Sequence, residues 1–173
     1  RYRGQEYSLN LGGAYQVTNA LTAIEALTCA GVTPAHIAMG IERARIPARM
    51  ELLPGDILLD GGHNPQAARA VRSALEDSGY ERRTAFIGMM NTKDHRAFLQ
   101  EILPCFDRVY FCDGFSEGEV PAEELRRISG LDGAEIFHSP REALKFARRD
   151  HEGGLMYFGG SFYFAAAVRE YLV

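Results

Sequence analysis

The fold is decided by the stretch Asp56-Ile-Leu-Leu-Asp60-Gly-Gly-His63-Asn64-Pro65. Its first five residues form a short apolar run that ends in a carboxylate, which is typical of a buried strand in a parallel sheet. The two glycines allow a tight loop. Asn64-Pro65 is a helix start, with asparagine as the N-cap and proline at the first helical position. The stretch therefore predicts a strand at 56–60, a loop, and a helix from Pro65 to about Ser78 that ends at Gly79.

The residues on both sides continue this alternation of short apolar runs and helical patterns. Upstream, Pro54-Gly55 is a turn dipeptide after the apolar Met50-Glu-Leu-Leu, which predicts an antiparallel hairpin. Ser139-Pro140 is a second cap-plus-proline pair, and Glu142 gives it capping-box spacing. Downstream, strands are predicted at 84–88, 108–112, 134–137 and 154–158, and helices at 94–103, 121–129, 140–149 and 161–172. The predicted fold class is α/β, a Rossmann-like, mainly parallel sheet with helices on both faces and one antiparallel hairpin strand.

The first part of the chain has a different pattern. Apolar residues recur at helical spacing from Ala14 to Ala30, and Thr33-Pro34 begins a second helix that runs to about Ala44. No strand pattern precedes the connector Ile46-Pro47-Ala48. We therefore predict a short helical segment at 1–46, followed by the α/β domain at 47–173.

Composition excludes several classes of function. The net charge of −4 argues against a nucleic-acid binder, which would need a basic face. No apolar run approaches the roughly 20 residues of a membrane span, and no signal peptide opens the sequence. The 3 cysteines form no C-x-x-C pair, which favours a reduced, cytoplasmic protein without disulfides. The chain begins at Arg1, as a cut, processed or designed chain would.

Ligands of parallel α/β sheets collect in the loops after the carboxyl ends of the strands, and Asp60 to Pro65 is the densest of these loops. A strand-end carboxylate can accept hydrogen bonds from a ribose diol. His63 and the helix N-terminus that follows it suit a carboxylate or phosphate. On residue chemistry alone, turn and cap roles for Asp60 and Asn64 are the favoured explanation, because glycine loops of this kind are weak motifs.

The other candidate residues also have ordinary explanations. Lys93-Asp94 could place an ammonium at the rim of a cleft, but this pair is also common at helix starts. Gly159-Gly160-Ser161 could form an anion nest, and a serine N-cap explains Ser161 equally well. Arg49 could clamp phosphate bidentately, or lie on the surface.

Asn19 lies opposite the apolar stripe of its helix and faces solvent or a partner. The histidines give no H-E-x-x-H or other ligand spacing, so no metal is assigned to the chain; they are residues 36, 63, 95, 138 and 151.

Five segments together resemble the Mur ligase superfamily, in its folylpolyglutamate synthase and dihydrofolate synthase branch. Leu11-Gly-Gly-Ala-Tyr-Gln-Val-Thr-Asn19-Ala-Leu-Thr-Ala is similar to the "G-x-x-Q-x-x-N-A-x-x-A" helix of the central domain. Pro47-Ala-Arg49 resembles "P-G-R", and Asp60-Gly-Gly-His-Asn-Pro65 resembles "D-G-A-H-N-P". Gly88-Met-Met-Asn-Thr-Lys93-Asp94 and Gly160-Ser161-Phe-Tyr match "G-x-x-x-x-K-D" and "G-S-x-Y". Ala48 and Gly62 depart from the pattern without removing a functional group.

The resemblance implies an ATP-dependent ligase that adds L-glutamate to a folate or dihydropteroate carboxylate through an acyl phosphate. It implies that Asn19 contacts the adenine, Arg49 the phosphates and Asp60 the ribose of ATP. His63 and Ser161 would lie near the incoming glutamate, and the possible cleft residues are Asn64, Lys93 and Asp94. Residues 1–46 would be a remnant of the central ATP-binding domain, and 47–173 the C-terminal glutamate ligase domain.

ATP and Mg²⁺ are therefore the expected cofactors. The family's phosphate loop resembles G-x-x-G-K-[ST], and no such stretch occurs in this sequence. The resemblance implies that the phosphate loop and the metal ligands belong to an N-terminal domain that the chain lacks, so the chain alone is expected to be inactive.

Other functions stay open at this point. A flavodoxin-like module that binds a nucleotide or a flavin would have the same pattern of elements. A phosphoacceptor receiver domain would use Asp60 and Lys93, but it also needs an acidic pair that Asp60-Gly-Gly does not provide. An interaction domain without a ligand and a Mur-type glutamate ligase with another substrate are further alternatives. Dihydropteroate, a folate monoglutamate and longer polyglutamates are the alternatives for the pterin substrate.

Overall fold

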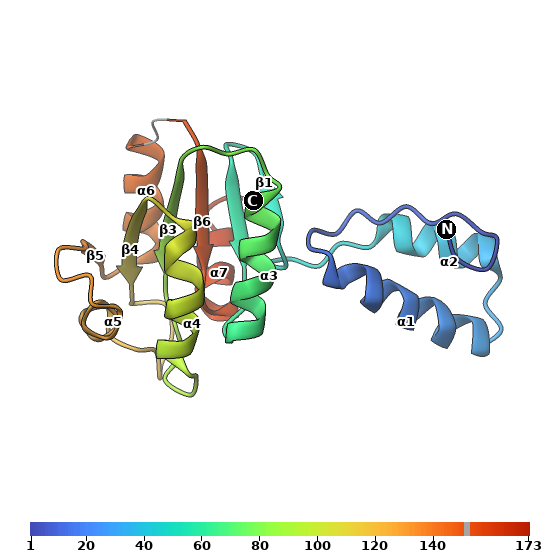
Figure 1. The fold of residues 1–173 in the computed structure, drawn as a ribbon, viewed down its shortest axis with the longest axis horizontal. Helices are drawn as coiled ribbons and strands as arrows, with labels where there is room; N and C mark the ends of the chain where they lie inside the picture. Colours follow the sequence, from blue (N-terminus) through green and yellow to red (C-terminus); the bar gives the residue numbers. More distant parts are fainter. Residues whose placement is uncertain (151–152) are drawn as a thin grey trace. The chain divides into compact units, whose positions relative to one another are not determined.

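The computed structural model describes residues 1–150 and 153–173, and the chain divides into two compact units, Arg1–Ile46 and Pro47–Val173. Figure 1 shows a helical first unit and a second unit built around a sheet.

The first unit is a pair of helices, α1 (Tyr15–Cys29) and α2 (Pro34–Arg43). The two helices predicted for this part of the chain are therefore confirmed. Gly31, with φ +81°, turns the chain between them, because glycine adopts this left-handed conformation without steric cost. The small core of the unit consists of Ile24, Ile37 and Ile41, against which Tyr2, Tyr7 and Leu9 pack.

The second unit contains one sheet, which has six strands in the described residues and the order β1-β2-β6-β3-β4-β5. β1 pairs antiparallel with β2, and each of the other neighbouring pairs is parallel. The predicted hairpin and the mainly parallel sheet are thus confirmed. The strands are β1 (Glu51–Leu53), β2 (Ile57–Asp60), β3 (Arg83–Ile87), β4 (Arg108–Cys112), β5 (Ile136–Phe137) and β6 (Leu155–Gly159).

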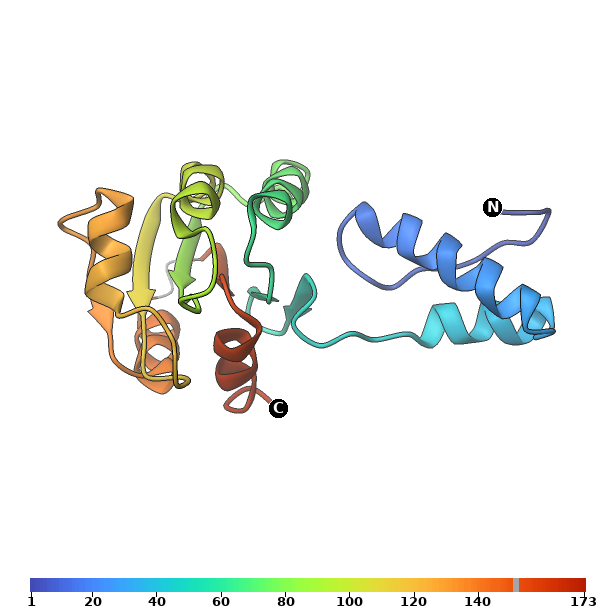
Figure 2. The same cartoon turned by 90° about the horizontal axis from the view of Figure 1, so that it is seen from below.

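Helices cover both faces of this sheet. Figure 2 shows α3, α4 and α5 on one face and α6 and α7 on the other. Their bounds are α3 (Pro65–Glu76), α4 (His95–Ile102), α5 (Ala122–Ser129), α6 (Pro140–Arg149) and α7 (Phe162–Arg169), and the short 3₁₀ helix η1 (Leu103–Cys105) follows α4. Among the described helices, none combines the length and the apolar character that a membrane span requires.

Aromatic side chains fill the core between the sheet and the helices α6 and α7. The Phe86 ring on β3 stacks on Phe158 of β6 at 4.6 Å and on Tyr110 of β4 at 4.9 Å between centroids. Phe164 of α7 is fully buried in the same cluster. Cys112 lies there too, and burial raises the pKa of its thiol, as expected for a small core residue.

The helix starts follow the cap chemistry of the sequence only in part, and the side chain of Thr33 makes no cap hydrogen bond at the start of α2. The Asn64 side chain accepts a hydrogen bond from the Ala67 N–H at 2.8 Å, and Asp94 accepts one from Ala97 at 3.1 Å. The side chain of Ser139 makes no cap hydrogen bond, so the predicted capping box with Glu142 is wrong. Ser139 still has the extended backbone of an N-cap, with φ −160° and ψ 130°.

Candidate functional site

The strand order brings three predicted loops together at the carboxyl ends of neighbouring strands. β6 lies between β2 and β3, with Gly159 opposite Asp60 on one side and Ile87 on the other. The loops that leave these three strands therefore start at the same level. They carry Asp60 to Pro65, Gly88 to Asp94, and Gly160-Ser161. Parallel α/β sheets bind their ligands at these carboxyl ends of the strands.

Asp60, the last residue of β2, is a buried carboxylate at these strand ends, with 3% of its surface exposed. Its Oδ1 accepts a hydrogen bond from the Gly62 N–H at 2.8 Å, and its Oδ2 accepts one from the Met50 N–H at 3.0 Å. Burial raises the pKa of Asp60, and the two N–H donors act in the opposite direction. Asp60 therefore fastens the segment before β1 to the loop after β2.

The segment around Arg49 has an unusual backbone. Ala48 and Met50 both adopt left-handed conformations, with φ +53° and +48°, which non-glycine residues rarely do. Hydrogen bonds compensate for this strain. The Gly61 N–H donates to the Ala48 carbonyl at 2.7 Å, and the Ala48 N–H donates to Glu51 Oε2 at 2.9 Å. The backbone on both sides of Arg49 is thus fixed.

Glu51 is itself anchored to the last helix. The Arg169 Nε donates to both carboxylate oxygens of Glu51, at 3.1 and 3.0 Å. Although its partial burial opposes ionisation, the hydrogen bonds from Arg169 and Ala48 lower the pKa of Glu51. Glu51 therefore links α7 to the segment that carries Arg49.

The side chain of Arg49 lies on an aromatic ring. Its guanidinium carbon is 4.2 Å from the centroid of the Phe162 ring, within the range of a cation–π interaction. Phe162 is the first residue of α7, so the guanidinium lies next to a helix N-terminus, where the backbone dipole favours an anion. A cation and a helix N-terminus at the same place can together bind phosphate or carboxylate.

His63 and Ser161 complete this cluster. His63 Nδ1 lies 3.1 Å from the Gly61 carbonyl oxygen. A carbonyl only accepts, so Nδ1 is the donor and Nε2 is the nitrogen left for a ligand. The His63 ring also meets the Phe162 ring edge-on, with 6.4 Å between centroids. Ser161 is 2% exposed, and its Oγ accepts a hydrogen bond from the Tyr163 N–H at 3.1 Å, so it caps α7.

The structure brings Arg49, Asp60, His63 and Ser161 together, but not every predicted residue joins them. Asn64 and Asp94 are the N-caps of α3 and α4, and Lys93 is exposed in the loop after β3. Asn19 is exposed on α1 of the first unit, where its Nδ2 donates to Gln16 Oε1 at 2.9 Å.

Phe162 and Glu51 belong to this site, although the sequence does not mark them as site residues. The sequence predicts Phe162 only as a helical residue of 161–172, and Glu51 as part of an extended run. The signal for Phe162 is its place directly after Ser161, where a helix begins at a strand end. The role of Glu51 has no local signal, because its partner Arg169 is 118 residues away in sequence.

A separate group of polar side chains lies at the carboxyl ends of β4 and β5. Ligand atoms of Asp113, Glu123 and His138 all lie within 4.8 Å of one another. Asp113 already accepts hydrogen bonds from the Ala122 N–H and from His138 Nδ1, both at 2.8 Å. The group is therefore explained by its own internal bonds. His151 lies outside the described residues.

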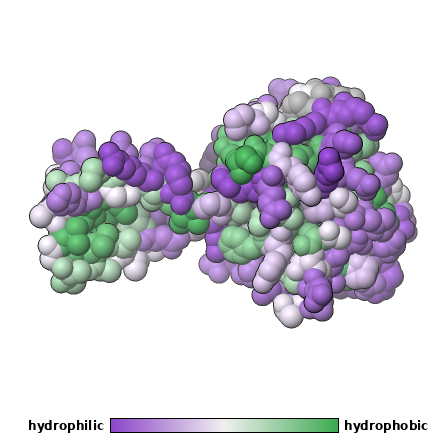
Figure 3. All heavy atoms as spheres, turned by 180° about the vertical axis from the view of Figure 1, so that it is seen from behind, coloured by the Kyte–Doolittle hydropathy of each residue, from purple (hydrophilic) through white to green (hydrophobic). Residues whose placement is uncertain are grey.

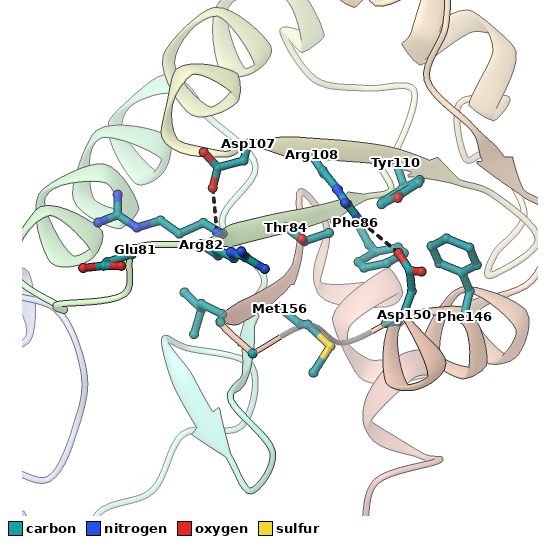
Figure 4. Close-up of a pocket in the computed structure, with 15 residues that line it drawn as sticks. Glu81, Arg82, Thr84, Phe86, Asp107, Arg108, Tyr110, Phe146, Asp150 and Met156 are labelled. Atoms are coloured by element: carbon teal, nitrogen blue, oxygen red, sulfur yellow. Dashed lines mark hydrogen bonds and ion pairs between the residues drawn. The ribbon is translucent and has the colours of Figure 1, made fainter.

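A cavity of about 370 Å³ lies at the amino ends of the strands, away from Asp60, which ends β2. Arg83, Arg108 and Leu155, the first residues of β3, β4 and β6, help to line it. Figure 4 shows Arg108 pointing toward Asp150, with which it forms an ion pair at 3.0 Å. None of the predicted site residues lines this cavity.

The sequence matches the family model described as "Mur ligase, glutamate ligase domain" over residues 48–162. It is 34% identical over 125 residues to a probable bifunctional folylpolyglutamate synthase/dihydropteroate synthase of Halobacterium salinarum, covering 70% of this chain and 15% of that protein. It is 28% identical over 185 residues to the folylpolyglutamate synthase of Lacticaseibacillus casei, covering 99% of this chain and 41% of that protein. The chain thus spans less than half the length of these curated relatives.

The fold is similar to that of a solved ligand complex. The structure of E. coli FolC in complex with DHPP and ADP superimposes with a TM-score of 0.79 at 28% sequence identity. The similarity covers 88% of this chain and 38% of that one.

Proposed function

The chain belongs to the Mur ligase family through its glutamate ligase domain, and from this premise we propose that it forms the nucleotide- and glutamate-binding wall of an ATP-dependent ligase. The proposed reaction adds L-glutamate to a folate or dihydropteroate carboxylate. The folate branch is supported by the names of the relatives from H. salinarum and L. casei, and by the ADP and DHPP in the E. coli structure.

The observation that supports this function most directly is the guanidinium of Arg49 on the Phe162 ring at the start of α7. In the proposal, Arg49 binds a phosphate of ATP, because guanidinium offers several donors in a plane that matches phosphate oxygens. Asp60 receives the ribose and Asn19 the adenine. Asp60 also holds the backbone beside Arg49, since its two carboxylate oxygens accept hydrogen bonds from the Met50 and Gly62 N–H groups.

The glutamate end of the proposed site is formed by His63 and Ser161. The N-terminus of α7, which Ser161 caps, favours the carboxylate of an incoming glutamate. His63 Nε2 is the nitrogen that a glutamate carboxylate or amine would meet, because Nδ1 is bound to the Gly61 carbonyl. Asn64, Lys93 and Asp94 are proposed to shape the cleft.

Bound ATP with Mg²⁺ would supply the phosphoryl group that activates the pterin carboxylate as an acyl phosphate, which the glutamate amine then attacks. ATP and Mg²⁺ together need a phosphate-binding cation and metal ligands. The described residues offer the cation, Arg49, but no group of three metal-binding side chains around Asp60. We therefore propose that the Mg²⁺ ligands and the phosphate loop come from an upstream, N-terminal domain of the same protein. Residues 1–46 would belong to its central ATP-binding domain.

The test is an assay of the full-length protein that contains this chain. We expect release of ADP that depends on both L-glutamate and a folate or dihydropteroate, and a rise of at least roughly tenfold in the KM for ATP when Arg49 is replaced by alanine. ADP release with a peptidoglycan precursor in place of the pterin would assign the chain to the Mur-type ligases. Absence of any glutamate-dependent ADP release would overturn the proposal.

A further inference from the structure

Phe162 is the residue on which the predicted site residues converge. The face of its ring carries the Arg49 guanidinium at 4.2 Å, and its ring lies edge-on to His63 at 6.4 Å between centroids. Arg49 comes from the segment before β1 and His63 from the loop after β2, so one ring contacts side chains from two different segments.

Gly61 leaves the space that this ring occupies. A Cβ atom added to Gly61 would collide with the Phe162 ring. Any other residue at this position would therefore push the ring away from its place under Arg49. The backbone of Gly61 also donates its N–H to the Ala48 carbonyl at 2.7 Å, so the same glycine touches the segment of Arg49 and the ring that supports it.

The backbone of Arg49 is fixed, but its side chain has several rotatable bonds. Hydrogen bonds to Asp60 and from Gly61 hold the residues on either side of Arg49. No hydrogen bond or ion pair of the Arg49 guanidinium is found among the described residues. The guanidinium lies over the Phe162 ring, and the charge of the Asp60 carboxylate attracts it. The ring is therefore the group that the guanidinium packs against, and the Asp60 carboxylate adds a less directional attraction.

We infer that Phe162 is a positioning residue of the proposed ligase site, and that it acts by holding the Arg49 guanidinium where ATP phosphate binds. The inference rests on the proposed function and adds to it a residue that acts through Arg49 rather than on the substrate. A guanidinium held in place loses less conformational freedom when phosphate binds, which strengthens binding of ATP.

The first experiment compares steady-state kinetics of the full-length enzyme with Phe162→Leu and Phe162→Tyr. Leucine removes the ring, and we expect the KM for ATP to rise roughly threefold to thirtyfold, the range that cation–π interactions cover. The tyrosine variant keeps the ring face and should restore the wild-type KM. Tyr171→Leu is the control, because Tyr171 is an aromatic residue just after α7, lies outside the G-S-x-Y motif and is 48% exposed. Its KM for ATP should be unchanged.

A double-mutant cycle separates positioning from a general structural effect. If Phe162 acts through Arg49, Phe162→Leu should have no further effect on the KM for ATP in an Arg49→Ala enzyme. An equal increase in both backgrounds, or an unchanged KM in Phe162→Leu alone, would overturn the inference. An inactive wild-type enzyme would instead count against the proposed function.

A second measurement does not need activity. In the 173-residue chain, the side-chain protons of Arg49 should show an upfield ring-current shift in NMR spectra. The shift should be lost in Phe162→Leu and kept in Phe162→Tyr and Tyr171→Leu. Arg49 protons at their random-coil positions in the wild-type chain would contradict the geometry on which the inference depends.

Discussion

At the scale of single residues, Asp60 connects two segments that are separate in sequence. One carboxylate oxygen binds the Gly62 N–H of its own loop, and the other binds the Met50 N–H. The second bond helps to hold Met50 in its left-handed conformation, directly after Arg49. Asp60 therefore positions the proposed phosphate-binding arginine whether or not it also contacts ribose.

The first prediction concerns Asp60→Asn. An asparagine has one acceptor oxygen and one NH₂ group, so either Met50 or Gly62 would lose its acceptor and face a donor. An unsatisfied buried N–H costs about 1–3 kcal/mol, and we expect this loss in the free energy of unfolding measured with urea at neutral pH. Asp77→Asn, at an exposed carboxylate after α3, should change the free energy by less than about 0.5 kcal/mol. A loss no larger than that of Asp77→Asn would show that Asp60 does not fasten the segment.

The pH dependence of this difference follows from the raised pKa of Asp60. The folded state binds a proton more tightly than the unfolded state, so the contribution of Asp60 to stability falls as pH rises from the unfolded pKa through the folded one. Asparagine does not titrate. The stability difference between the two proteins should therefore be larger at acidic pH than at neutral pH.

The second prediction concerns His138. Its Nδ1 donates to Asp113 at 2.8 Å, and this hydrogen bond raises the pKa of His138 above its ordinary value. Asp113→Asn should lower that pKa, as followed by NMR titration of the imidazole protons, because the amide cannot compensate the positive charge. Since the folded pKa is raised, the stabilising effect of the pair is present below the unfolded pKa and is lost as pH rises through the folded pKa. An unchanged pKa in Asp113→Asn would contradict the pairing.

At the scale of secondary-structure elements, two similar sequence signals give different caps. Asn64-Pro65 and Ser139-Pro140 both begin helices, and both cap residues have an extended backbone. Only Asn64 accepts a hydrogen bond, from the Ala67 N–H. The stability of α3 therefore depends on its cap side chain, and that of α6 does not.

The third prediction follows from this contrast. Asn64→Ala should lower the free energy of unfolding by about 1 kcal/mol, the usual cost of losing an N-cap. Ser139→Ala is the matched change at a cap without a side-chain bond and should cost at most a few tenths of a kcal/mol. Thermal or urea unfolding of the two variants side by side measures the difference. Equal losses would mean that the cap geometry is not what distinguishes these helices.

The positions of the elements were predictable because their signals are local. The strand at 108–112 and the helix at 140–149 have the predicted bounds, and Pro54-Gly55 gave the hairpin. The predicted strand 134–137 is shorter in the structure, where β5 contains Ile136 and Phe137. The order of strands was not predictable, since the place of β6 between β2 and β3 depends on pairing between residues far apart in sequence.

The site was predictable only in part. Arg49, Asp60, His63 and Ser161 stand next to strand ends or turn signals, and family resemblance selected them. The bond from Met50 to Asp60 had no signal, because nothing in the sequence marks Met50 as a left-handed residue. The stacking of Arg49 on Phe162 depends on the pairing of β2 with β6, which brings Gly61 and Phe162 together.

At the scale of the whole chain, the first unit has a small core and leaves apolar side chains exposed. In the first unit, the described core contains Ile24, Ile37 and Ile41, while Val17 and Met39 are 55% and 42% exposed. Figure 3 shows apolar surface on this unit. A unit of this size buries little apolar area. The proposal that residues 1–46 belong to a larger ATP-binding domain would account for this exposed surface.

The fourth prediction is that the isolated chain binds ATP weakly. The sequence contains Arg49 but no G-x-x-G-K-[ST] loop, so most contacts with the triphosphate are not available. Calorimetric titration should give a dissociation constant above the micromolar range for ATP, and no binding of FMN. Sub-micromolar binding of FMN would favour a flavodoxin-like module. Sub-micromolar binding of ATP would mean that the phosphate loop is not needed for affinity.

The edge strands of the sheet affect how the protein behaves in concentrated solution. β1 and β5, which form its two edges, are also its shortest strands, with 3 and 2 residues. An open edge can recruit a strand from another molecule, and the strength of that pairing grows with the number of backbone groups on offer. Edges this short offer few of them. The long strands β3 and β6, which could template a growing fibril, each have a neighbour on both sides, whereas β4 is paired with β5 only at Phe111 and Cys112.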